Sequence, residues 1–553
     1  MMSRGAPTSR LAAIALSLLL LSQVVAGVLY IERTALLDGP ADAPQRVYVL
    51  WDDAMISMRY ARNLAAGEGF VWNPNGERVQ GYTNLGLTLV MAAVHALPIP
   101  PERTALWIQG LALGCLLGIA LLAATLVFRV TSNAWAATGT VFALLLCSPY
   151  QIYALQGSDT VFVSLLLLAG CARLLPPQRT GGAGDYRIDG LLPLLFAVLV
   201  RPDASLFVAC ATGVIAALPD SRGPRLALAP VFLLAAVWIG LTTFSLLYYG
   251  DPLPNTWYLK ATGTPVSMML ASGFEQLASF AHYALPALVV AALFAPRVLR
   301  DATDKSDTQR VFALLGSFVV VGIAYHLWVG GDWMRDYGSR HLVQQIPALI
   351  VLAAIGVAQL SRIAGARFEF LAGPATQAAL SVGSLLVIGA CLNPQAPARE
   401  WFNREAPTLL HAENQGNFDR ARFLAEATRP NTTVAAHWAG IGPYFAERES
   451  LDVLGRSDKH IARMQVDRFI AGHSKWDWNY VLESRKPDII DFESRGLRNH
   501  PRFRSDYAAL VLGPAKFLFV RKEALNKILD RSLGIAPVER IFGPLETGAS
   551  SQN

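Results

Sequence analysis

Two adjacent carboxylates, Asp52 and Asp53, stand near the start of the stretch WDDAMISMRYARNLAAGEG at residues 51–69, after the first long apolar segment of the chain. Carboxylates at the start of a helix accept free backbone N–H groups and suit the positive helix end, so capping could explain one of the pair. Capping explains less well why two of them follow a Trp near a bilayer surface. The alternative is chemical: one carboxylate acts as a general base, while the other, Asp53, supports it or binds a divalent cation such as Mg²⁺, Mn²⁺ or Ca²⁺.

A second group of candidates carries positive charge near the ends of apolar segments: Arg201, Lys260, Arg335, Arg340 and His341. Any one of them could simply extend to the lipid headgroups, or form a local ion pair as Arg201 could with Asp203. Taken together with the carboxylates they suit a phosphate, because Arg binds phosphate oxygens in pairs and Lys acts as a point charge. We therefore expect them to form a site for a lipid-linked phosphate.

Further polar and aromatic residues in the same loops and in the last third of the chain are candidates for substrate contact. They are Arg59, Tyr82, Asn84, Asp159, Asn255, Tyr258, Asp332, Trp333, His473 and Lys475. The simpler interpretation for Tyr258 and Trp333 is the aromatic belt of a membrane protein, although aromatic rings also stack on sugars. For His473 and Lys475 a surface turn is as good an explanation as an acceptor groove.

The elements that must position these residues are mostly membrane helices. Of 553 residues, 53% are hydrophobic and only 16% charged, which indicates a polytopic membrane protein. The net charge of +6 follows from membrane topology, so no nucleic-acid surface is predicted. The five cysteines are scattered and predict neither disulfides nor a zinc site. Eleven spans are expected, at 11–30, 104–128, 134–151, 158–175, 188–200, 203–218, 225–247, 281–298, 309–329, 341–360 and 374–391.

The apolar stretch 84–98 is short, and we expect it to form a helix at the membrane interface. With the N-terminus inside, the Arg- and Lys-rich loops then fall on the cytoplasmic side: the one after Arg129, 173–187, 219–225, 297–310 and 362–367. The loop 31–103 and every unusual polar motif fall on the outer face. This pattern predicts a multi-pass protein of the plasma (inner) membrane with its active site outside.

Beyond residue 391 the composition becomes that of a soluble protein. We expect a membrane module over 1–391 and an extracytoplasmic α/β domain over 392–553, because an odd number of spans places the latter outside. Short strands are predicted at 432–436, 486–491, 508–512 and 516–521, and helices at 418–428 and 457–470.

The motifs together resemble those of the GT-C superfamily of membrane glycosyltransferases, and in particular the branch of terminal arabinofuranosyltransferases. The stretches that carry the resemblance are residues 51–84, YYGDPLPNTWYLK, VGGDWM with SRHLVQQIP, LDVLGRSDKHIAR and GHSKWDW. It implies transfer of one sugar, with inversion, from a polyprenyl phosphate to a hydroxyl group. It also implies that Asp52 is the base, that Asp53 supports it, and that Lys260, Arg335 and Arg340 hold the donor phosphate. Asp159 stands where many relatives have Glu, and His341 where Phe is common.

The expected activity is therefore transfer of a sugar, with arabinofuranose as the best candidate, to a cell-surface glycan or protein. The expected partners are the lipid donor, this acceptor and the membrane lipids. A transporter or flippase for a lipid-linked sugar is the main alternative, but it should show ionisable residues in span centres or repeated broken spans. A scaffold that binds surface glycan without catalysis is a third possibility, disfavoured by the retained carboxylates and basic residues.

Overall fold

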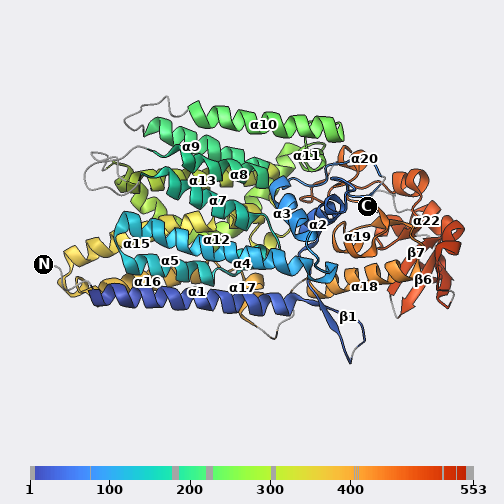
Figure 1. The fold of residues 1–553 in the computed structure, drawn as a ribbon, viewed down its shortest axis with the longest axis horizontal. Helices are drawn as coiled ribbons and strands as arrows, with labels where there is room; N and C mark the ends of the chain where they lie inside the picture. Colours follow the sequence, from blue (N-terminus) through green and yellow to red (C-terminus); the bar gives the residue numbers. More distant parts are fainter. Residues whose placement is uncertain are drawn as a thin grey trace.

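The computed structural model describes residues 6–40, 42–74, 76–176, 186–218, 228–300, 307–403, 405, 408, 410–466, 468–513, 516–530 and 532–543. The molecule is elongated: a bundle of apolar helices fills one end, and a smaller part with a β-sheet fills the other (Figure 1). The basic loop 219–225 lies outside the described residues, as do large parts of 173–187 and 297–310.

Within the described ranges, seven helices are long and apolar enough to cross a membrane. They are α1 (Ala6–Thr34), α4 (Pro101–Thr131), α10 (Leu228–Tyr249), α12 (Val266–Arg300), α13 (Asp307–Val329), α15 (Ile346–Arg367) and α16 (Pro374–Cys391). An eighth predicted span is broken: α5 (Ala134–Leu146) meets α6 (Ser148–Leu155) at 66°, where Pro149 in the first turn of α6 cannot extend the preceding helix.

The remaining three predicted spans form shorter apolar helices: α7 (Thr160–Leu174), α8 (Leu191–Val200) after η1 (Ile188–Gly190), and α9 (Ser205–Ala217) after η2 (Pro202–Ala204). The 15 residues of α7 extend for about 22 Å, less than the roughly 30 Å of a hydrocarbon core. Eleven spans thus stay a prediction. The segment assigned to the interface is also a short helix, α3 (Leu85–His95).

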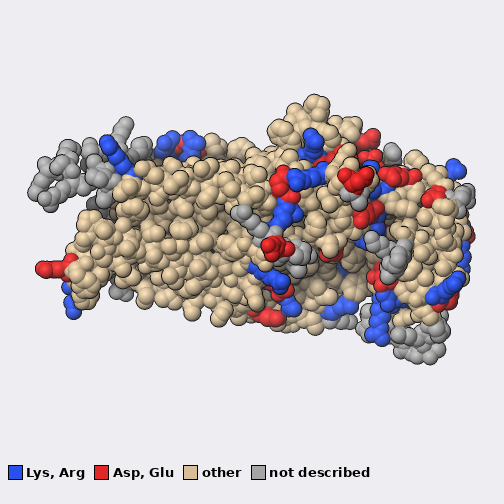
Figure 2. Space-filling view, turned by 90° about the horizontal axis from the view of Figure 1, so that it is seen from below, with Lys and Arg blue, Asp and Glu red and all other residues tan. Residues whose placement is uncertain are grey.

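The bundle is built around α15, the most buried of the long helices, which packs against α4, α5, α12, α13 and α16. Small residues let α5 and α16 approach closely: a Cβ on Gly389 would lie 2.6 Å from the Cα of Ala143. By contrast, α10 lies on the outside of the bundle, and few of its residues are buried. Figure 2 shows a broad face of the bundle nearly without charged side chains, which suits contact with lipid.

The loop 31–103 lies between the bundle and the C-terminal part (Figure 1). It contains the antiparallel pair β1 (Leu36–Asp38) and β2 (Gln45–Val47), then α2 (Asp52–Ala65) and α3. Gly67 and Gly69 follow α2 with φ of 85° and 88°, a conformation that ends a helix and favours glycine. Four short helices lie in the connections between and after the long helices: α11 (Asn255–Ala261), η4 (Arg335–Tyr337), α14 (Arg340–Val343) and α17 (Gln395–Phe402). A further short helix, η5 (Glu369–Leu371), precedes α16.

The C-terminal part contains a six-stranded sheet of order β4-β3-β5-β7-β6-β8, in which β3 is parallel to β4 and β5 and the other pairs are antiparallel. Its strands are β3 (Thr433–Ala436), β4 (Glu449–Asp452), β5 (Ile489–Ile490), β6 (Tyr507–Gly513), β7 (Lys516–Arg521) and β8 (Gly534–Pro537). Its helices are α18 (His411–Ala427), α19 (Ile441–Ala446), α20 (Lys459–Ala462), η6 (Tyr480–Arg485), α21 (Arg495–Arg498), α22 (Pro501–Asp506), η7 (Lys522–Lys527) and α23 (Val538–Phe542).

The predicted fold class, a mainly helical membrane bundle with a C-terminal part that contains strands, is confirmed. The four predicted strands correspond to β3, β5, β6 and β7, whereas β4 and β8 were not predicted. The helix predicted over 457–470 is wrong in length: only α20 forms, and the described residues after it are irregular.

Candidate active site

A partly open cavity lies where the loop 31–103, the bundle and the C-terminal part meet, and it encloses about 1020 Å³ when the space at its open mouth is included. Its walls come from α2, the segments 81–84 and 156–159, α11, Trp333 and Arg340, and from α18, Trp438 and Arg456 of the C-terminal part. Eight of the sequence-predicted site residues line it: Asp52, Asp53, Tyr82, Asn84, Asp159, Lys260, Trp333 and Arg340. A concave, mixed polar and apolar site at a junction of structural units is typical of ligand binding.

Neither carboxylate at the start of α2 forms a side-chain cap with its own helix. Asp52 instead accepts hydrogen bonds from two backbone N–H groups of the C-terminal part, Gly440 at 3.1 Å and Ile441 at 2.8 Å. Burial raises the pKa of Asp52 to about 7, although the N–H of Ile441 and the charge of Arg456 act in the opposite direction. Asp52 is therefore a fixed carboxylate that can take up a proton near neutral pH.

The neighbouring Asp53 has the opposite electrostatic environment. Its two oxygens are bonded to two guanidinium groups, Arg340 at 2.9 Å and Arg456 at 2.8 Å. Burial favours the neutral acid, but the charges of Arg456, Arg340 and Lys260 outweigh it and hold the pKa of Asp53 well below its usual range. Asp53 thus stays ionised and fixes the positions of the two arginines.

Lys260 is the exposed cation of the cavity. No described residue forms a hydrogen bond or ion pair with its ammonium group, although Arg340, Arg456 and Asp53 are near enough to affect it. The surrounding protein and the positive charge of Arg340 lower the pKa of Lys260 to about 8. An unpaired ammonium beside two guanidinium groups is suited to binding an anion.

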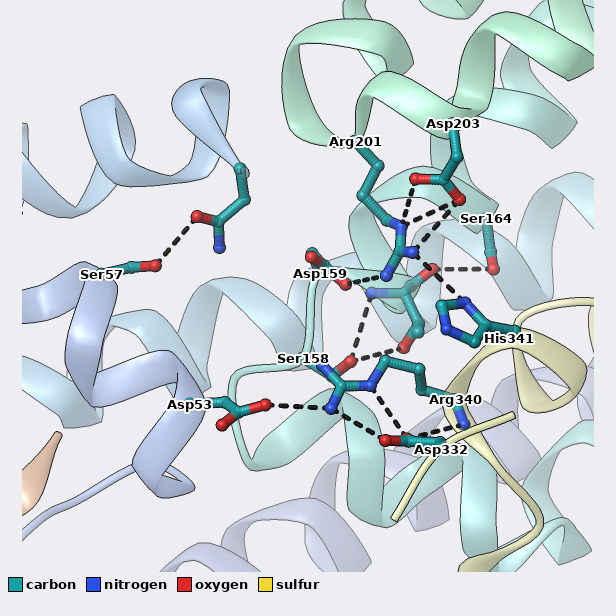
Figure 3. Close-up of polar contacts among 12 residues, drawn as sticks. Asp53, Ser57, Ser158, Asp159, Ser164, Arg201, Asp203, Asp332, Arg340 and His341 are labelled. Carbon is teal, nitrogen blue, oxygen red and sulfur yellow. Dashed lines mark hydrogen bonds and ion pairs between the residues drawn. The ribbon is translucent and has the colours of Figure 1, made fainter. Parts of the chain in front are cut away.

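Arg340 connects this group to the bundle (Figure 3). Its guanidinium binds both oxygens of Asp332, at 2.9 and 3.1 Å, as well as Asp53. A second group lies beside it: Arg201 is bonded to Asp159 at 2.9 Å and Asp203 at 3.0 Å, and its guanidinium lies 3.3 Å from Nδ1 of His341. Arg201 and His341 therefore lie behind the cavity wall formed by Asp159.

The C-terminal part contributes from the carboxyl ends of its parallel strands, the edge at which α/β sheets commonly bind ligands. Trp438 follows β3 by two residues, and Arg456 follows β4 by four. Asn255 holds the loop after β4 in place, since its amide donates to the carbonyl oxygens of Gly455 and Arg456 at 2.9 and 3.0 Å. Asn255 thus positions Arg456 and does not itself line the cavity.

Comparison with known proteins finds similar structures but no similar curated sequence. No curated protein sequence matches this chain significantly. A family described as "Domain of unknown function (DUF8728)" matches residues 407–527. The crystal structure of apo ArnT from Cupriavidus metallidurans matches with a TM-score of 0.53 at 13% identity, covering 93% of this chain and 99% of that chain.

The fold is GT-C. ArnT bound to undecaprenyl phosphate also matches, with a TM-score of 0.47, 13% identity and coverage of 79% and 85% of the two chains. So does the oligosaccharyltransferase of Archaeoglobus fulgidus in complex with Zn and sulfate, with a TM-score of 0.48, 10% identity and coverage of 78% and 62%. At 13% identity the likeness to apo ArnT establishes the fold alone, so the chemistry has to be argued from the cavity.

Several predicted site residues lie away from the cavity. Arg335 is 63% exposed and faces Glu275. Arg59 is buried and donates to the carbonyl oxygens of Trp72, Pro443 and Arg448, so it joins α2 to the C-terminal part. Lys475 is fully buried, with its ammonium bonded to the carbonyl oxygens of Tyr258 and Ala462.

Tyr258 lies under the guanidinium of Arg463, at 4.1 Å from the ring centre, and is also outside the cavity. His473 does not line the cavity but packs against two residues that do, Trp333 and Trp438. Among the residues inside, Asn84 accepts from Ser57 and the hydroxyl of Tyr82 lies 3.0 Å from that of Tyr249. These contacts hold Asn84 and Tyr82 in place in the cavity wall.

The most important residues missed from the sequence are in the C-terminal part: Glu413, Asn414 and Asn417 on α18, together with Trp438 and Arg456. The first three lie in the polar stretch HAENQGNFD, where the helical spacing of Glu413 and Asn417 is a signal that could have found them. Arg456 belongs to the stretch LDVLGRSDKHIAR, but its type and position alone did not set it apart.

The expected divalent cation does not fit the arrangement of the described side chains. Both oxygens of Asp53 are bonded to arginines. No group of three or more His, Cys, Asp or Glu residues in the described ranges is placed to hold a metal ion. Binding of a metal by Asp53 would require displacement of at least one guanidinium, and no step below relies on it.

Proposed function

We propose that this chain is a GT-C glycosyltransferase that moves one sugar from a polyprenyl-phosphate donor to an acceptor hydroxyl. One observation carries the proposal: a carboxylate with a pKa near 7 shares a single cavity with Arg340, Arg456 and an unpaired Lys260. The two functional needs of the reaction are a base for the acceptor and positive charge for the departing phosphate. Both are met within this cavity.

In the proposed reaction Asp52 takes the proton from the acceptor hydroxyl. The acceptor oxygen forms a bond to the anomeric carbon as the bond between that carbon and the phosphate oxygen breaks. The electron pair leaves with the polyprenyl phosphate, whose added negative charge is stabilised by Lys260, Arg340 and Arg456. A single displacement of this kind inverts the configuration at the anomeric carbon.

Asp53 has a different part in this proposal. Its ion pairs with Arg340 and Arg456 hold both guanidinium groups toward the cavity and keep its own proton affinity low. It is thus a positioning residue for the phosphate site, while Asp52 is the base. Arg201 and His341 support the wall from behind.

The finer parts of the proposal rest on the motifs of the sequence. We propose arabinofuranose as the sugar and a glycan or protein of the cell envelope as the acceptor. We also propose that the cavity lies on the outer side of the plasma membrane, and that a membrane module over 1–391 is followed by an extracytoplasmic domain over 392–553. The distribution of the basic loops and the change in composition at residue 391 support this topology.

The test is incubation of the purified protein with a panel of polyprenyl-phosphate sugars and acceptor glycans, with released lipid phosphate and product measured by mass spectrometry. Asp52→Asn should lower transfer by about 10²–10⁴-fold, the usual contribution of a general base, and leave donor binding intact. Glu523→Gln, on the surface of the C-terminal part, is the control and should keep full activity. Full activity of Asp52→Asn would remove the base assignment, and translocation of donor without a new glycosidic bond would favour the transporter.

A further inference from the structure

Three aromatic rings meet beside the cavity, from segments far apart in the sequence. Trp333 belongs to the connection after α13, Trp438 follows β3, and His473 lies in the loop after α20. The ring centres are 5.8 Å apart for Trp333 and Trp438, 5.5 Å for Trp333 and His473, and 5.9 Å for Trp438 and His473. We call these three residues the aromatic cluster.

The aromatic cluster is only partly buried, and both tryptophans line the cavity that holds Asp52. Trp333 is fixed by its neighbour, because its backbone N–H donates to Asp332, the residue that also binds Arg340. The indole of Trp438 is near enough to Glu413 on α18 to favour the ionised form of that carboxyl group. The rings are therefore held in place from both the bundle and the C-terminal part.

Amide and carboxyl groups lie beside the three rings, one of which is an imidazole. Asn414 and Asn417 line the cavity from α18, in the turn of helix next to Glu413. In His473 the Nδ1 atom lies 3.1 Å from the carbonyl oxygen of Ala471 and so carries the proton, whereas Nε2 is buried with no hydrogen-bond partner among the described residues. Burial lowers the pKa of His473 to about 4, so its ring packs against the two tryptophans as a neutral imidazole.

We propose that the aromatic cluster and this face of α18 form the acceptor subsite, and that the acceptor is a carbohydrate chain rather than a protein. The inference rests on the proposed function and narrows its acceptor to one class. A sugar ring has an apolar C–H face that packs on indole, and hydroxyl groups around its edge that both donate and accept hydrogen bonds. Trp333 and Trp438 offer the flat faces, and Asn414, Asn417 and Glu413 offer partners for the hydroxyls.

The charges of this wall also favour an uncharged ligand. The cations of the cavity, Lys260, Arg340 and Arg456, are grouped around Asp53, whereas α18 presents two neutral amides and one carboxylate. Donor phosphate and acceptor are thus assigned to different walls of the same cavity. Asp52 accepts a hydrogen bond from the N–H of Gly440, which lies in the same loop as Trp438. The proposed base is therefore attached to the loop that forms part of the acceptor subsite.

The first experiment measures binding without catalysis. Short arabinan, galactan and mannan oligosaccharides are titrated against the Asp52→Asn full-length protein, with saturation-transfer NMR and tryptophan fluorescence as readouts. At least one glycan should bind, and Trp438→Ala in the same background should weaken that binding by 10-fold or more. Trp328→Ala is the matched control, because Trp328 is 54% exposed on α13, and it should bind as before.

The second experiment separates acceptor from donor in the active enzyme. Trp438→Ala should raise the acceptor KM by 10-fold or more while the donor KM and the slow hydrolysis of donor by water stay within a factor of about two. Trp438→Phe should recover most of the loss, because a ring face is retained. An equal rise in both KM values, or binding and transfer confined to unglycosylated peptides, would overturn the carbohydrate subsite.

The two proposals fail in different ways. If Asp52→Asn remains active while Trp438→Ala loses acceptor binding, the base assignment falls and the subsite stands. If the wild-type protein transfers sugar but Trp438→Ala changes neither glycan binding nor the acceptor KM, the transferase stands and the subsite falls. Thermal melting of both tryptophan variants shows whether a loss of binding comes from misfolding.

Discussion

Two groups of charged residues lie side by side at the cavity, and they differ in whether their charges are satisfied within the protein. Arg201 is bonded to two carboxylates, Asp159 and Asp203, and its side chain is only 9% exposed. In the other group Lys260 has no partner among the described residues. The first group has the features of a structural joint between helices, and the second those of a binding site. The difference indicates that unpaired charge, more than the mere number of basic residues, marks where a ligand belongs.

The largest expected effect tests the structural group. Arg201→Met leaves Asp159 and Asp203 buried without their cation, which should cost about 3–5 kcal/mol of stability, as for other broken buried pairs. The apparent melting temperature of the detergent-solubilised protein measures it. Arg187→Met is the control, because its pair with Asp189 is exposed and the melting temperature should barely change. Equal melting of Arg201→Met and wild type would show that this group is not a structural joint.

The next effect tests how the binding group is positioned. A Cβ on Gly440 would lie 2.0 Å from the backbone oxygen of Asp52 and 2.8 Å from its Oδ1, so Gly440→Ala must displace the proposed base. A shift of about 1 Å at a reacting group costs about 10²-fold in rate, so kcat should fall by that order while the donor KM changes little. Gly442→Ala is a close control, because its Cβ would meet only Asp491, at 3.8 Å. Equal kcat values for the two variants would show that the contact between Gly440 and Asp52 does not position the base.

The local structure of α2 could be predicted from its sequence, because its apolar spacing and the glycines after it act over short range. Asp52, Lys260 and Arg340 could also be found, since charged residues at the ends of membrane spans are few. Arg456 could not, because its approach to Asp53 depends on how a segment some 400 residues later packs on the bundle. Sequence spacing carries no information on such a contact.

Residue type also fails to show which way a side chain points. Lys475 and Lys260 are both lysines in loops or short helices beside aromatic residues, yet only one ammonium faces the cavity. Lys475 is buried because two backbone carbonyls lie within reach, a fact of tertiary structure. The strand β4 was missed for a related reason: its pairing with β3 is a tertiary contact that the local sequence does not show.

The smallest and most specific effect concerns the charge of Lys260. Transfer requires Asp52 ionised and Lys260 protonated, so kcat/KM should rise as pH passes about 7 and fall as it passes about 8. Lys260→Arg keeps the cation at every working pH, so the alkaline fall should disappear while the acid limb stays. Lys260→Ala should raise the donor KM by about 10–100-fold, the value of a hydrogen bond to a charged group, with little change in melting temperature.

The bound donor should change the pKa of Lys260, which the pH profile of kcat reports. A phosphate beside Lys260 stabilises its ammonium, so the alkaline limb of kcat should lie at higher pH than that of kcat/KM. Lys522→Ala, on the surface of the C-terminal part, is the control and should reproduce the wild-type profile. If the alkaline limb persists unchanged in Lys260→Arg, another group titrates there. Lys260 would then belong, like Arg201, to the residues that hold the structure together.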